Sequence, residues 1–173
     1  MKENKSVVKD TTKKKKKKRN PWVSLLTKIV TIILIVVALY QFVGEVHVIH
    51  DNYMYPKVVD GDLVVTYKLD KLHSSDVIVY KIENKAYIGR VVAVEGDTID
   101  FNETGYTVNG LNPYEVIFYP TDKIGNLNYP YTLKEGEVFV LCDYREQGTD
   151  SRTFGPITDI HGKVVLLLRG RGF

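Results

Sequence analysis

The sequence predicts a mainly β domain preceded by one N-terminal membrane helix. Residues 22–43 are apolar apart from a few scattered polar side chains, and about twenty apolar residues span a bilayer core of about 30 Å. After them, short stretches rich in Val, Ile and Tyr alternate with turn signals such as Asp60-Gly61 and Asn109-Gly110. No later segment sustains a period of 3.6 residues. Coiled antiparallel sheets forming a small barrel-like body are therefore expected.

Each apolar stretch between two turn signals is expected to form one strand. An extended segment over 45–50 leads out of the anchor. The expected strands after it are 63–69, 76–82, 86–94, 97–101, 106–108, 113–119, 137–142 and 164–168. Residues 121–129 are polar and contain glycine, which predicts a loop.

The charge of the chain is concentrated at its N-terminus. Residues 1–20 carry ten Lys and Arg against Glu3 and Asp10, a net charge of about +8, whereas the whole chain carries +3. Such a run is expected to be disordered, and the positive-inside rule places it in the cytoplasm. It is expected to touch anionic lipid, and nucleic acid is not an expected partner.

Three segments follow from this arrangement: a basic cytoplasmic tail (1–20), an uncleaved transmembrane anchor (21–43) and an extracellular β domain (44–173). A cleavable signal peptide is the alternative, but the apolar run is too long for one and no A-x-A site follows. The expected location is the cell membrane, crossed once. The single cysteine, Cys142, excludes an intramolecular disulfide, and its apolar neighbours predict a buried thiol.

Three motifs follow one another in the outer domain. The first is Tyr53-Met54-Tyr55-Pro56 with Asp60-Gly61-Asp62, and the second is Tyr87-Ile88-Gly89-Arg90-Val91. The third runs from Cys142-Asp143-Tyr144-Arg145 through Gly148 to Asp150-Ser151-Arg152 and Gly155. Together they resemble type I signal peptidase, the peptidase S26 family, whose members are membrane serine proteases with a Ser/Lys dyad. The resemblance covers residues 47–168 and implies the signal peptidase I type of antiparallel β fold.

The resemblance also shows what this chain lacks. The family's serine precedes the methionine, where this chain has Tyr53, and its lysine stands at Gly89. A family serine that hydrogen-bonds this lysine corresponds to Gly148. Asp51 falls near a further family serine of the oxyanion hole, where a carboxylate would repel the developing charge. Asp51 and Tyr53 remain alternative candidates for the altered nucleophile position. Catalytic residues are therefore not expected, since a serine needs an adjacent base.

The other motif residues are expected to shape the groove and hold its loops. They are Met54, Pro56, Arg90, Asp143, Arg145, Asp150, Ser151 and Arg152. Ion pairs within 143–145 and 150–152 would pin a loop. Strand alternation places Lys81 and Lys85 on the side of Gly89, where one of them could serve as a relocated base, but solvated surface lysines are the favoured interpretation. His47-X-X-His50 on an extended stretch gives no metal spacing, so neither a metal nor a cofactor is expected.

Two functions remain open. Signal-peptidase-like proteins without the dyad are associated with Gram-positive pilus operons and sortase, so the resemblance implies a non-catalytic accessory protein or chaperone for a pilin precursor or another secreted protein. An extended peptide would pair with a strand edge of the groove. The alternative is a serine-independent peptidase that cleaves signal peptides, in which Asp51 works with Asp143 or Asp150, or Cys142 acts as a nucleophile. The non-enzyme is favoured.

Overall fold

The computed structural model describes residues 20–42, 44–103, 105–113 and 121–170. The chain divides into two compact units, Met1–Val36 and Val37–Phe173. Each unit is described here by itself.

The N-terminal helix α1 spans Pro21–Phe42. Pro21 occupies the first helical position, where a missing backbone N–H leaves no hydrogen bond unmade. Its 22 residues extend about 33 Å at 1.5 Å per residue. The stretch Pro21–Gln41 has a mean hydropathy of 2.5, and its most apolar window has no buried residues. The helix is thus long and apolar enough to cross a membrane, as an anchor or as a signal sequence.

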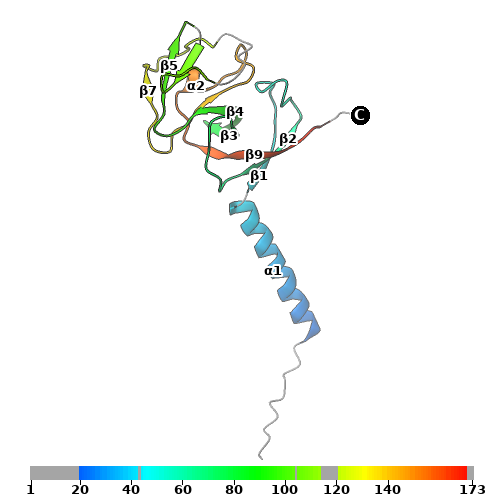
Figure 1. The fold of residues 1–173 in the computed structure, drawn as a ribbon. Helices are drawn as coiled ribbons and strands as arrows, with labels where there is room; N and C mark the ends of the chain where they lie inside the picture. The colour runs from blue at the N-terminus through cyan, green and yellow to red at the C-terminus, as the bar shows by residue number, and fades with distance from the viewer. Residues whose placement is uncertain (1–19, 43, 104, 114–120, 171–173) are drawn as a thin grey trace, which may run out of the picture. The chain divides into compact units, whose positions relative to one another are not determined.

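A six-stranded antiparallel sheet forms the larger part of the β domain, in the order β1-β2-β9-β3-β4-β8 (Figure 1). Its strands are β1 (Gly44–Val48), β2 (Leu63–Tyr67), β3 (Val77–Ile82), β4 (Lys85–Ala93), β8 (Phe139–Leu141) and β9 (Ile160–Leu168). The register shifts within the β2–β9, β3–β9 and β4–β8 pairs. Such bulges bend and twist a sheet, which gives it the coiled form expected from the sequence.

A second, three-stranded antiparallel sheet has the order β6-β5-β7 (Figure 1). It is formed by β5 (Thr98–Asn102), β6 (Gly105–Val108) and the two-residue strand β7 (Tyr131–Thr132). A single-turn helix, α2 (Ser151–Phe154), lies between β8 and β9 in the chain. The prediction of a mainly antiparallel β domain is therefore confirmed.

Three clusters of buried side chains form the core. One contains Met54, Val64, Val79 and Ile88 and supports the segment that follows β1. Another, centred on Tyr80, packs on the opposite face of β3. The third joins the two sheets and consists of Val92, Ala93, Ile99, Tyr106, Leu133, Phe139 and Leu141.

Most expected strands lie where the apolar stretches predicted them. The strand expected at 137–142 is shorter, and the one expected at 164–168 begins earlier, at Ile160. This early start includes Gly162, whose φ of +139° and close approach to the Tyr67 carbonyl exclude a side chain. The expected strand at 113–119 lies almost wholly outside the described residues, and 121–129 is a loop as predicted. The sequence did not predict β7 or α2.

Candidate functional site

A cleft of about 360 Å³ lies between the chain that follows β1 and the hairpin of β3 and β4. On its hairpin side, β4 pairs with β3 over 85–90, whereas β8 pairs only with Arg90, Val91 and Ala93. The edge of β4 at 85–89 that faces away from β3 therefore has no strand partner among the described residues. The residues that line the cleft are His47, Val48, Ile49, His50, Asp51, Tyr53, Val79, Asn84, Lys85, Ala86, Tyr87 and Ile88.

Asp51 and Tyr53, the two candidates for the altered nucleophile position, both line this cleft. The Asp51 carboxylate accepts a hydrogen bond from the Tyr53 backbone N–H at 3.1 Å. Burial raises the pKa of the Asp51 carboxyl, opposed by that hydrogen bond and by Lys85. Neither side chain can act as the family's serine does, because a phenol or a carboxylate needs a different activation from a serine hydroxyl.

The first and third motifs meet at Tyr53, which lines the cleft. The Tyr144 N–H donates to the Tyr53 carbonyl at 2.8 Å. The Asp143 N–H contacts the sulfur of Met54, which is fully buried, at 3.4 Å. Pro56 follows in the same turn. Residues some ninety positions apart are thus joined where the family's nucleophile would be presented.

Gly89 lies in a packed part of β4. A Cβ at this position would overlap the Val140 Cγ1 methyl and lie 3.5 Å from the ring of Tyr80. Tyr80 and Val140 are both fully buried. A lysine cannot enter here unless Val140 moves, so the space next to the missing base is filled with apolar atoms.

Gly148 is packed in the same way against Cys142. A Cβ at Gly148 would overlap the Cys142 Cβ and lie 2.6 Å from its sulfur. Cys142 is fully buried, as the sequence predicted, and its thiol lies 3.7 Å from the Thr149 carbonyl. Burial raises the pKa of the Cys142 thiol well above its usual range, with Asp150 adding to the effect. A neutral, buried thiol is a poor nucleophile.

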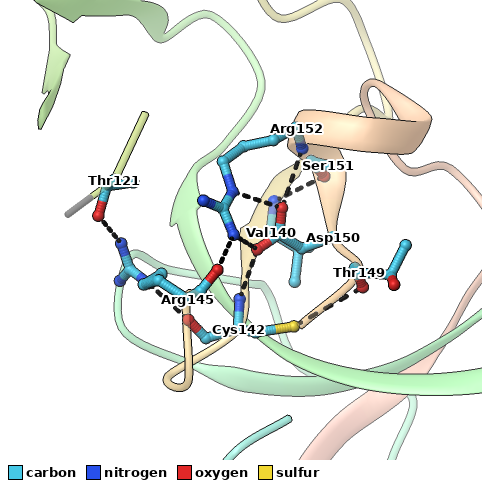
Figure 2. A network of polar contacts seen from close by, with 8 residues as sticks. All are labelled: Thr121, Val140, Cys142, Arg145, Thr149, Asp150, Ser151 and Arg152. Atoms are coloured by element: carbon cyan, nitrogen blue, oxygen red, sulfur yellow. Dashed lines mark hydrogen bonds and ion pairs between the residues drawn. The ribbon is translucent and has the colours of Figure 1, made fainter. Parts of the chain in front are cut away.

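Figure 2 shows the network that fixes the third motif. Asp150 caps α2 through the Arg152 N–H and pairs with the Arg152 guanidinium at 2.9 Å, with both side chains buried. The second Asp150 oxygen accepts from the Cys142 N–H, and the Ser151 hydroxyl accepts from the Val140 N–H. Arg145 donates to the Cys142 carbonyl and to Thr121. The motif residues therefore hold β8 and α2 together.

The ion pairs differ in one respect from those expected within the motif. Asp150 pairs with Arg152, but Asp143 pairs with Arg90 of β4, at 2.6 Å. Arg90 also donates to the Ser75 carbonyl. Because both carboxylates are engaged by arginines, neither is available as the partner that a carboxylate mechanism of Asp51 requires.

The expectation that Lys81 and Lys85 share the side of Gly89 is half wrong. Gly89 pairs with Ile78, and Lys85 pairs with Ile82 of the same β3 face. Lys81 pairs with Ala86 and lies on the other face, since cross-strand partners point the same way. The reason is the two-residue turn at Glu83-Asn84, which shifts the alternation. Lys85 is exposed and lies over the Tyr87 ring.

Two side chains that matter at this site were not identified from the sequence. Tyr80 and Val140 fill the space beside Gly89, yet in the sequence each is one apolar residue among many in a strand. Tyr80 is buried with its hydroxyl unpaired among the described residues, and burial raises its pKa well above the usual range. The glycine itself is the only sequence signal for this crowding.

A coiled antiparallel β domain that brings these three motifs into contact defines a protein of the signal peptidase class. The chain matches the family described as Signal peptidase, peptidase S26 over residues 22–168, and it belongs to that family.

Its relatives include proteins named as signal peptidases and proteins named as inactive signal peptidases. It is 29% identical to "Inactive signal peptidase IA" of Staphylococcus aureus, covering 83% of this chain and 90% of the relative. It is 32% identical to "Signal peptidase I" of Bacillus caldolyticus, covering 75% and 82%. A crystal structure of a signal peptidase I from Enterococcus faecalis matches with a TM-score of 0.45 at 22% identity, covering 56% of this chain and 98% of that one. The similarity to relatives named as inactive agrees with the expectation that favours a non-enzyme.

Proposed function

We propose that this chain is a non-catalytic signal peptidase homologue that holds an extended segment of a secreted protein in its cleft. The observation that carries the proposal is the packing at Gly89 and Gly148. Both positions of the missing base and its partner are closed by buried side chains, Val140 and Cys142. A lysine and its serine partner therefore cannot occupy these positions without repacking of Val140 and Cys142.

The cleft supports the binding half of the proposal. The unpaired edge of β4 at 85–89 offers main-chain donors and acceptors along one wall. An extended peptide adds to such an edge as a further strand, while side-chain pockets select its sequence. Binding without cleavage then follows from an intact groove that lacks a nucleophile and a base.

The partner we propose is a pilin precursor, held for sortase during pilus assembly at the outer face of a Gram-positive membrane. This assignment rests on the resemblance to signal-peptidase-like pilus proteins. In the same proposal α1 is a single-pass anchor with the basic N-terminus in the cytoplasm. The apolar helix and the charge asymmetry support that topology.

The first experiment measures cleavage and assembly with the same variants. The full-length protein in lipid vesicles is incubated with a pilin precursor, and pilus polymer is measured in cells that carry each variant. Ala86→Trp fills the cleft, and Thr132→Trp places the same side chain on an exposed strand of the other sheet. We expect no cleavage by any form, and a loss of polymer of at least about ten-fold with Ala86→Trp alone.

Two results would contradict the proposal. Precursor cleavage by the wild type that disappears in Asp51→Asn would establish the alternative peptidase, whose only support is a half-buried carboxyl in the cleft. Undiminished polymer with Ala86→Trp would exclude the cleft as the binding site.

A further inference from the structure

Three side chains with metal-binding atoms converge at one end of the larger sheet. Glu45 and His47 project from the same face of β1, two residues apart, and His161 lies at the start of β9. Their ligand atoms all lie within 4.8 Å of one another. The cluster joins two strands that do not pair directly, because β2 lies between them in the sheet.

The distances suit a small tetrahedral ion. Zn²⁺ binds nitrogen and oxygen at about 2.0–2.2 Å, which places two ligand atoms of a tetrahedron about 3.3 Å apart. Glu45 Oε2 lies 3.4 Å from His47 Nε2 and 2.7 Å from His161 Nδ1. The hydrogen bond between His161 and Glu45 must open by roughly 0.6 Å, and the two histidine nitrogens, which lie within 4.8 Å of each other, must reach the same spacing. Side-chain rotation alone covers shifts of this size.

His47 supplies an atom, its buried Nε2, that lies in ion-pair distance of Glu45 but forms no hydrogen bond with any of the described residues. A buried polar atom without a partner costs free energy, and a bound ion is one way to remove that cost. The two histidine rings stand edge to face, with centroids 5.9 Å apart, so their nitrogens approach the carboxylate from different directions.

The outer partners orient the ligands as in metal sites. Lys68 holds the other oxygen of Glu45 at 2.5 Å, which leaves Oε2 for the centre of the cluster. Asp159 lies 3.7 Å from Nε2 of His161, the ring nitrogen that faces away from the cluster, which is beyond hydrogen-bond distance. A small movement of this exposed carboxylate would bring it to the far nitrogen, where a carboxylate fixes the tautomer of a ligating histidine.

We propose that Glu45, His47 and His161 form a binding site for a divalent transition-metal ion of the Zn²⁺ class, with water as the fourth ligand. The ion ties β1 to β9 at the end of the sheet where the chain leaves α1 in sequence. His47 also lines the cleft, so the ion fixes one of the cleft's side chains. This site was not predictable from the sequence, because His161 lies 114 positions after His47 and the spacing His47-X-X-His50 contributes only one ligand.

The test is a Zn²⁺ titration of the full-length chain in detergent after treatment with a chelator. Calorimetry is expected to give one Zn²⁺ per chain. His47→Gln and His161→Gln each remove a ligand and are expected to weaken binding by more than the ~10–100-fold that loss of an outer partner costs. His50→Gln and His73→Gln are matched controls, because both histidines are exposed and outside the cluster. Their affinity is expected to remain that of the wild type.

A second measurement on the wild type does not depend on the folding of any variant. Co²⁺ added to the metal-free chain is expected to give the intense visible absorption of a four-coordinate site, and Zn²⁺ is expected to abolish it. The absence of saturable binding of one equivalent would overturn the proposal. Binding that persists unchanged in both His47→Gln and His161→Gln would overturn it as well, and would leave the cluster as an ion-pair network that stabilises the sheet.

Discussion

Cys142 and Gly148 fit each other, because the thiol of Cys142 occupies the space that any side chain at Gly148 would need. A Cβ at Gly148 would lie 2.6 Å from the sulfur and 3.0 Å from the Tyr144 carbonyl oxygen. The signal peptidase pattern has a glycine where this chain has Cys142 and a serine where it has Gly148, so the larger of the two side chains lies at the other position. A side chain at position 148 therefore needs a smaller residue at position 142, which makes the two differences from the family a matched pair.

This relationship predicts strong coupling between the two positions. Gly148→Ser alone is expected to lower the free energy of unfolding by about 1–3 kcal/mol through overpacking. Adding Cys142→Gly is expected to restore part of the loss, with a coupling energy of about 0.5–3 kcal/mol. Thermal unfolding of the full-length protein in detergent, followed by near-UV circular dichroism, measures each corner of the cycle.

The control for this cycle keeps the bulk at position 142. Cys142→Ser retains a γ atom, so it is expected to give no relief when combined with Gly148→Ser. Simple additivity of Cys142→Gly and Gly148→Ser would show that the two side chains do not compete for the same space.

Gly89 and Val140 provide a second packed pair. Gly89→Ala introduces a Cβ that overlaps the Val140 methyl, and we expect a loss of about 1–3 kcal/mol in unfolding free energy. Val140→Ala removes the overlapping methyl, so the double variant is expected to lose less than the sum of the two single variants. The same unfolding measurement decides the outcome. An unaffected Gly89→Ala protein would mean that the site is open, and the main support for a non-catalytic protein would be lost.

The buried pair of Asp150 and Arg152 predicts a large stability effect. Asp150→Asn removes the charge that neutralises a buried guanidinium, and breaking a buried pair in this way costs about 3–5 kcal/mol. The matched control is Asp70→Asn, because Asp70 pairs with Lys163 in an exposed contact at 3.5 Å. That loss is expected to stay below about 1 kcal/mol. Equal losses in the two variants would show that the Asp150 network does not hold the third motif.

The sequence predicted the anchor helix and the main strands because their signals are local. An apolar run of this length and alternating β-branched stretches need no tertiary contact to be recognised. It did not predict α2 or β7, since four and two residues are too few to carry a period. The expected side of Lys81 was wrong because the strand alternation does not continue through the turn at Glu83-Asn84. This two-residue turn pairs Lys81 with Ala86, so Lys81 lies on the opposite face of the sheet from Lys85.

The site was only partly predictable for a different reason. The motifs marked Asp51, Tyr53, Gly89 and Gly148 through their positions in a known pattern. What fills the space beside the two glycines depends on contacts between strands distant in sequence. Arg90 with Asp143, and His47 with His161, are likewise brought together only by the sheet order.

Asp51 gives a prediction of pH dependence in the cleft. Burial raises the pKa of its carboxyl in the folded protein above the ordinary value of 3.8, so the folded state binds the proton more strongly than the unfolded state. The charged carboxylate therefore lowers stability at neutral pH, and this penalty disappears as the pH falls through the raised pKa toward 3.8. Asp51→Asn keeps an oxygen that accepts the Tyr53 N–H and removes the charge. We expect the variant to melt at a higher temperature than the wild type at pH 7, with the two melting temperatures converging below pH 3.8. A variant that is less stable than the wild type at pH 7 would show that favourable contacts stabilise the charged carboxylate. A difference in melting temperature that does not change with pH would show that the charge of Asp51 does not affect stability.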